Sequence, residues 1–125
     1  MQISKNVSYN EAIKSNTATR LGIDNLPDQK QIDNMKLVAD KIFQPLREFV
    51  GGPIKINSFF RSPDLNRAIG GSSKSQHCLG LAMDLDDTFG HKTNAEMFNW
   101  IRKNLDYDQM IWEFGSDDNP AWVHV

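Results

Sequence analysis

Residues 75–84 read SQHCLGLAMD, and the end of this stretch has the pattern of a β-strand, which is the main indication of the fold. Side chains alternate in character over residues 81–86, and successive side chains of a strand point to opposite faces. Met83 and Leu85 therefore fill a core, while Asp84 faces the other way. The pattern predicts a strand that presents one carboxylate to a cleft, directly after a loop rich in Gly and Ser.

The last four residues show the same alternation of side chains as residues 81–86. In residues 122–125, WVHV, His124 shares a face with Trp122 and lies opposite the two valines. His77, in the polar loop, is a third candidate, because one ligand from a loop and two from strands can converge on one ion. Two histidines and one aspartate form a three-ligand zinc site that leaves a fourth position open for water. We therefore predict His77, Asp84 and His124 as zinc ligands and hydrolysis as the chemistry.

These blocks resemble the zinc D-alanyl-D-alanine peptidases of the M15 type, whose fold is related to the hedgehog signalling domain. The family motif Ser-x-His-x-x-Gly-x-Ala-x-Asp is filled at every fixed position of residues 75–84. Residues 58–63, SFFRSP, followed by Asn66, are similar to the family segment Ser-Gly-Tyr-Arg-Ser-Pro, with Phe59 where glycine is usual. Further matches lie in SNTA and GIDN, residues 15–18 and 22–25, so the likeness covers nearly the whole chain.

The resemblance implies a phage or bacterial zinc peptidase, similar to subfamily A of the M15 type. Its substrate would be a peptidoglycan peptide, cleaved by a D-Ala-D-Ala carboxypeptidase or a cross-bridge or stem-peptide endopeptidase. By the same resemblance, Arg61 lies beside the metal, where it steadies an oxyanion or grips a substrate carboxylate. The alternative for Arg61 is a structural salt bridge beneath the helix that starts at Ser62 and Pro63. Ser75 either binds substrate or orders the loop before His77.

Hydrolysis at zinc also needs a proton carrier, and a carboxylate near the metal is the usual choice. Some M15 enzymes place a glutamate three residues before the last histidine, where this chain has Ala121. The other family arrangement puts it at the end of the preceding strand, where Glu113 fits and shares a face with Ile111. Asp117 and Asp118 compete for the role, although their loop has ordinary turn chemistry. We predict Glu113 as the catalytic base.

Two other residues could be mistaken for metal ligands. His91 belongs to no recognisable block and is predicted to be structural. Cys78 adjoins His77, but its side chain should point away if the segment is extended, so we do not expect it to bind metal. As the only cysteine, it permits no intrachain disulfide.

Helix signals precede and separate the predicted strands. Residues 8–11 and 93–96 have the form of capping boxes, and an amphipathic helix is predicted from 28 to 49 with Pro45 as a kink or early end. Strands are expected in four segments: residues 54–58, 81–86, 109–114 and 122–125. The predicted fold is α+β, a small antiparallel sheet with helices packed mainly on one face, in one domain spanning residues 1–125.

Composition excludes several function classes. The 125 residues carry a formal net charge of −2, and acidic and basic residues are interspersed. The sequence therefore has no basic patch of the kind that binds nucleic acid. No apolar run approaches the ~18 residues that span a bilayer. Because the N-terminus lacks a secretory signal, we expect synthesis in the cytoplasm and action on the cell wall, as for a phage lysin. The alternative hypotheses are a non-catalytic, zinc-containing module of a cell-wall-binding or phage structural kind, or a binding domain of hedgehog type.

Overall fold

The computed structural model describes residues 2–72, 74–87, 89–105, 110–113, 119 and 122–125. It begins with an antiparallel hairpin of β1 (Gln2–Ser4) and β2 (Val7–Ser8), which the sequence analysis did not predict. Strands of three and two residues are too short for a hydrophobic period to appear. The predicted capping box then starts α1 (Tyr9–Ile13), and α2 (Asn16–Leu21) follows it.

The predicted long helix is present, but its hydrogen bonding changes along its length. It consists of α3 (Gln29–Val38), the π-helical segment η1 (Ala39–Phe43) and α4 (Gln44–Val50). Pro45 has no backbone N–H to donate to the preceding turn, so the regular bonding pattern cannot pass it unchanged. The helix continues to Val50 instead of ending early at the proline.

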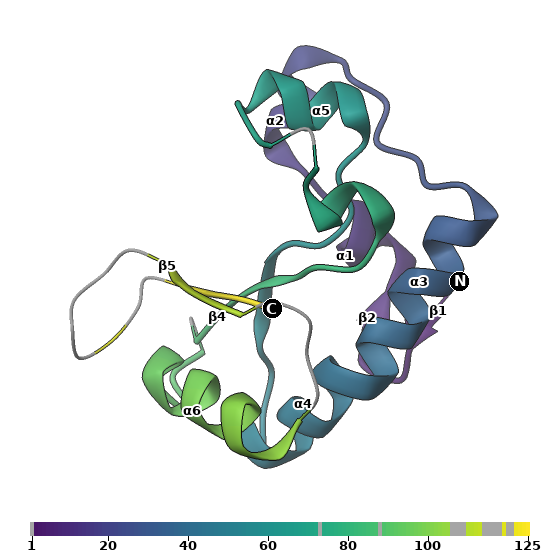
Figure 1. Ribbon diagram of the computed structural model, residues 1–125. Helices are drawn as coiled ribbons and strands as arrows, with labels where there is room; N and C mark the ends of the chain where they lie inside the picture. Colours follow the sequence, from purple (N-terminus) through teal and green to yellow (C-terminus); the bar gives the residue numbers. More distant parts are fainter. Residues whose placement is uncertain (1, 73, 88, 106–109, 114–118, 120–121) are drawn as a thin grey trace.

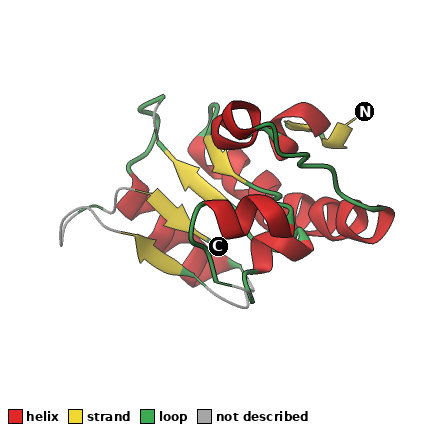
Figure 2. Cartoon of the chain, turned by 90° about the horizontal axis from the view of Figure 1, so that it is seen from above, coloured by secondary structure: helices red, strands yellow, loops and turns green. Residues whose placement is uncertain are grey.

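Four strands form the second sheet, in the order β3-β4-β6-β5, with every neighbouring pair antiparallel (Figure 2). They are β3 (Lys55–Ser58), β4 (Asp84–Asp86), β5 (Ile111–Glu113) and β6 (Trp122–His124). Residues 109 and 114, the predicted ends of the third strand, lie outside the described residues. In the centre of the sheet Asp84 pairs with His124 and Leu85 with Val123, so polar and apolar pairs alternate between the two faces.

Three further helical elements lie in the described part of the chain. They are α5 (Pro63–Ala68), the 3₁₀ turn η2 (Gln76–Leu79) and α6 (Asn94–Asn104). Ser62 caps α5 with proline at the first helical position, and Thr93 caps α6 in the predicted box with Glu96. Figure 1 shows α2 and α5 together at one end of the molecule, with α6 and α4 at the other.

One hydrophobic core joins the sheet to the long helix and to α6. Leu85 and Val123 contribute from the sheet, Met35 and Leu46 from the long helix, and Ile101 from α6; all five are fully buried. The apolar face of the sheet is thus covered by helices, which confirms the predicted α+β class. Among the described residues, no helix is both long and apolar enough to cross a membrane.

Candidate metal centre

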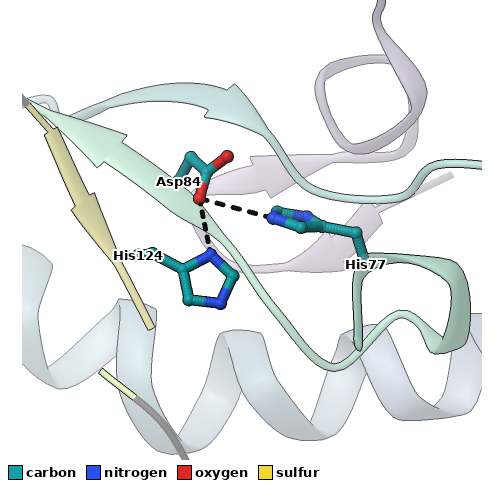
Figure 3. A group of neighbouring side chains, drawn as sticks. All are labelled: His77, Asp84 and His124. Carbon is teal, nitrogen blue, oxygen red and sulfur yellow. Dashed lines mark hydrogen bonds and ion pairs between the residues drawn. The ribbon is translucent and has the colours of Figure 1, made fainter. Parts of the chain in front are cut away.

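Three predicted ligands, from three separate elements, meet at one point (Figure 3). His77 comes from η2, Asp84 from the first position of β4 and His124 from the last position of β6. One potential ligand atom from each lies within 4.8 Å of the other two. Asp84 and His124 lie close together because they are direct partners in the pairing of β4 with β6.

The turn that carries His77 is shaped by its flanking residues. The Ser75 side chain accepts a hydrogen bond from the His77 backbone N–H at 3.3 Å and so caps the turn at its start. At its end, Gly80 adopts a left-handed conformation with φ of 76°, and a Cβ there would lie 2.6 Å from the Gln31 carbonyl oxygen. Glycine is therefore required on two grounds. The contact of Ser75 is of the loop-ordering kind, which was one of its two predicted roles, and its predicted role in substrate binding stays a prediction.

The ring of His77 is oriented by a main-chain group. Its Nδ1 lies 2.8 Å from the Phe59 carbonyl oxygen, which can only accept, so Nδ1 carries a proton and donates. The other nitrogen, Nε2, is buried without a hydrogen-bond partner among the described residues and faces Asp84 Oδ1 at 3.3 Å. With the ring neutral, Nε2 and Oδ1 are both acceptors, so their contact is favourable only when a proton or metal ion lies between them. An oriented imidazole of this kind is typical of metal ligands.

Asp84 lies between the two histidines. Its Oδ1 is 2.9 Å from His124 Nδ1, and its Oδ2 is 4.0 Å from Arg61 Nη2. Burial raises the pKa of Asp84, but the hydrogen bond with His124 and the close contact with His77 outweigh that effect and hold the pKa well below its ordinary value. The carboxyl group is therefore ionised at neutral pH, as a metal ligand must be.

Arg61 is half-buried at the edge of this group. Its Nη1 donates to Asn66 Oδ1 at 3.3 Å, which ties the guanidinium to α5. Its Nε is buried without a partner among the described residues. The contacts with Asn66 and Asp84 agree with the structural role considered for Arg61, but the side chain also lines the cleft described next.

A cleft of about 680 Å³ opens over the three candidate ligands. Ser75, Arg61 and Glu113 line it together with them. Glu113 is half-buried and pairs with Trp122, two residues from His124 on the same strand, so both side chains lie on the cleft face. The competing Asp117 and Asp118, like Ala121, lie outside the described residues.

Sequence reasoning assigned no role to Asn25, which holds the Arg61 segment in place. Its Nδ2 donates to the carbonyl oxygens of Ile13, at 2.8 Å, and Phe60, at 3.1 Å. Its Oδ1 accepts from the Ser62 backbone N–H at 2.7 Å. This buried amide thereby joins the end of α1 to the residues on either side of Arg61. Asn25 belongs to the family-like segment GIDN, residues 22–25, which was the one feature of the sequence that could have indicated a role for it.

His91 and Cys78 belong to no potential metal-binding cluster among the described residues. The His91 ring packs against Gly52, where an added Cβ would lie 2.3 Å from it. Burial raises the pKa of the Cys78 thiol, with the Arg61 charge opposing the change, so this cysteine is protonated at neutral pH. The prediction that Cys78 does not bind metal stays a prediction.

Comparison with protein families identifies the family of this chain. A family model described as Peptidase M15 matches residues 5–125, which is nearly the whole chain. The matched range includes the three clustered ligands, Arg61 and Glu113. No curated protein matches the sequence.

Proposed function

Because the chain belongs to the peptidase M15 family, we propose that it is a zinc-dependent peptidase that hydrolyses peptidoglycan peptides. The observation that carries this proposal is the cluster of His77, Asp84 and His124 at the base of a cleft. Glu113 and Arg61 line the same cleft, so a proton carrier and a fixed cation accompany the candidate ligands.

The donor set fits zinc. Imidazole nitrogens and a carboxylate oxygen are ordinary zinc ligands, and three protein ligands are typical of catalytic sites. His77 would bind through Nε2, because its Nδ1 is engaged by the Phe59 carbonyl. Asp84 would bind through its carboxylate and His124 through Nδ1, the atom that faces Asp84. When bound, zinc supplies Lewis-acid polarisation and lowers the pKa of water.

Glu113 is the group that moves the proton in this proposal. Its carboxylate takes a proton from the attacking water as the new carbon–oxygen bond forms. It then gives that proton to the nitrogen of the leaving amine as the carbon–nitrogen bond breaks. Its position on the cleft face of β5, next to the strand of His124, supports this assignment.

Arg61 provides positive charge that does not have to be reorganised during the reaction. The Asn66 contact limits the movement of its guanidinium, which lines the cleft. A fixed cation stabilises the developing oxyanion more than the ground-state carbonyl. The same group would serve equally to bind a substrate carboxylate, and Ser75 at the cleft wall would contribute a hydroxyl to substrate binding.

The proposed substrate is a peptidoglycan peptide of the cell wall, cleaved by carboxypeptidase or endopeptidase action. The resemblance of residues 58–63 and 75–84 to D-Ala-D-Ala peptidases supports this substrate class. The open cleft has a volume in the range of sites that take small molecules and short peptides.

Mass spectrometry of digested peptidoglycan fragments tests the proposal. Zinc-loaded protein is incubated with stem peptides and cross-linked dimers, with and without a chelator. We expect release of alanine or cleavage of a cross-bridge, lost with the chelator and restored by added zinc. No product from any fragment, despite confirmed zinc occupancy, would contradict the proposal and favour the non-catalytic wall-binding or phage structural module.

A further inference from the structure

The cleft over the metal centre continues along one edge of the sheet. A hollow of about 280 Å³ shares Ser58, Arg61 and Ile69 with the cleft. A second hollow, of about 150 Å³, shares residues 14–16 and Asn57 with the first. We call these two hollows the β3 groove. Its walls are residues 14–17, which form the link from α1 and the first turn of α2, and residues 55–58 of β3.

One wall of the groove is an edge strand. Within the described sheet β3 is the first strand, with β4 as its one neighbour. Among the described residues, no backbone hydrogen bond joins residues 14–17 to β3; the hydrogen bond from the Phe60 N–H to the Ala12 carbonyl involves residues outside both segments. An unpaired strand edge can bind an extended peptide through main-chain hydrogen bonds. The groove is thus suited to a peptide that continues from the metal centre.

The charged side chains that line the groove are all positive. Lys14 and Lys55 line it and are exposed, and Arg61 lies where it joins the cleft. No carboxylate is among its described lining residues. Asp86, which accepts a hydrogen bond from Asn94 at 2.9 Å, stands opposite Lys55 in the register, so its carboxylate offsets part of the Lys55 charge and Lys14 is the main cation of the groove. Neither lysine has a carboxylate within 4.0 Å in the part of the chain that is described.

We propose that the β3 groove holds an extended part of the substrate that carries a carboxylate, and that Lys14, assisted by Lys55, recognises it. This inference rests on the proposed peptidase function and specifies its substrate class, an acidic peptide extending past Arg61. The carboxylate meets positive charge in the groove without displacing an existing ion pair of Lys14. A neutral peptide would lose this attraction and keep the main-chain contacts.

Matched peptides test the proposal through specificity. Two stem peptides that differ only in a free or amidated side carboxylate are compared by kcat/KM with the zinc-loaded protein. The wild type should prefer the free acid by about twofold to fivefold, the range of an exposed ion pair, and added salt should reduce the preference. Lys14→Gln should lose the preference, and Lys14→Glu should reverse it.

Lys41→Gln is the matched control, since Lys41 is exposed on η1 and lines neither the cleft nor the groove. It removes the same charge and should keep the wild-type preference. An equal preference in wild type and Lys14→Gln would overturn the inference while leaving the peptidase proposal intact.

A binding measurement separates the two proposals where no peptide is cleaved. The zinc-loaded Glu113→Gln variant, with and without Lys14→Gln, is titrated with each peptide. Tighter binding of the free acid that disappears with Lys14→Gln would support the groove, even if turnover fails. Equal Kd values for acid and amide would overturn it.

Discussion

The two faces of β4 and β6 are built from the same cross-strand pairing but serve opposite purposes. On the core face Leu85 and Val123 are fully buried beneath helices. On the cleft face, one residue away on each strand, Asp84 and His124 hold polar atoms in contact. A shift of either strand by one residue in the register would turn its apolar side chains to the cleft and its polar side chains to the core. The core face needs only apolar side chains of suitable volume, whereas the cleft face needs particular atoms at particular distances.

Removing a ligand from the cleft face should have the largest effect on activity. In Asp84→Ala the carboxylate between His77 and His124 is lost. We expect hydrolysis to fall by at least about 100-fold, since even loss of an outer-shell partner costs about 10- to 100-fold. Peptide turnover and bound zinc are measured together, with Asp40→Ala, an exposed aspartate of η1, as control. Wild-type turnover in Asp84→Ala would remove this residue from the metal centre.

Glu113→Gln separates chemistry from metal binding on the same face. The amide keeps the shape of the side chain but cannot take the proton, so kcat should fall by about 100- to 10,000-fold. Zinc content should stay at the wild-type level, because Glu113 is outside the ligand cluster. Full activity in this variant would assign the proton transfer to another group.

On the core face the expected loss is stability. Leu85→Ala removes a fully buried side chain and should lower the free energy of unfolding by about 2–5 kcal/mol. Urea denaturation measures the change. Leu37→Ala is the control, because Leu37 on α3 is 52% exposed and its replacement should cost within about 0.5 kcal/mol. Equal losses at both positions would contradict the assignment of the two faces.

The smallest expected effect is a pH dependence of the metal-free protein. The pKa of Asp84 is lowered in the folded state, so at acidic pH the unfolded chain binds more protons and stability rises with pH. This contribution is complete above the ordinary aspartate pKa of about 3.9 and is lost as pH falls below it. Urea denaturation from neutral to strongly acidic pH should show a shallower decline in Asp84→Asn than in wild type. Parallel declines would show that Asp84 does not contribute.

The sequence allowed much of the cleft face to be predicted, because strand alternation is a local signal. Alternation placed Asp84, His124 and Glu113 on the cleft-facing sides of their strands, in agreement with the register. The helix caps predicted at Ser8, Ser62 and Thr93 are present, and they were recognisable because each depends on residues at most three positions apart.

Contacts between distant segments could not be predicted in the same way. The Phe59 carbonyl that orients His77 is a main-chain group, which no side-chain pattern reveals. Asn25 forms hydrogen bonds with Phe60 and Ser62, which lie 35 or more residues away in the sequence. The π-helical segment before Pro45 was not predicted either, because a proline signals a break in regular bonding without specifying how it is accommodated.

Calorimetric titration of zinc into the metal-free protein tests the central claim most directly, that His77, Asp84 and His124 form a metal centre. Wild type should bind one zinc per chain, and His124→Ala should lose that binding while its circular dichroism spectrum stays that of the folded protein. No zinc binding by the folded wild type, or unchanged binding by His124→Ala, would contradict the account.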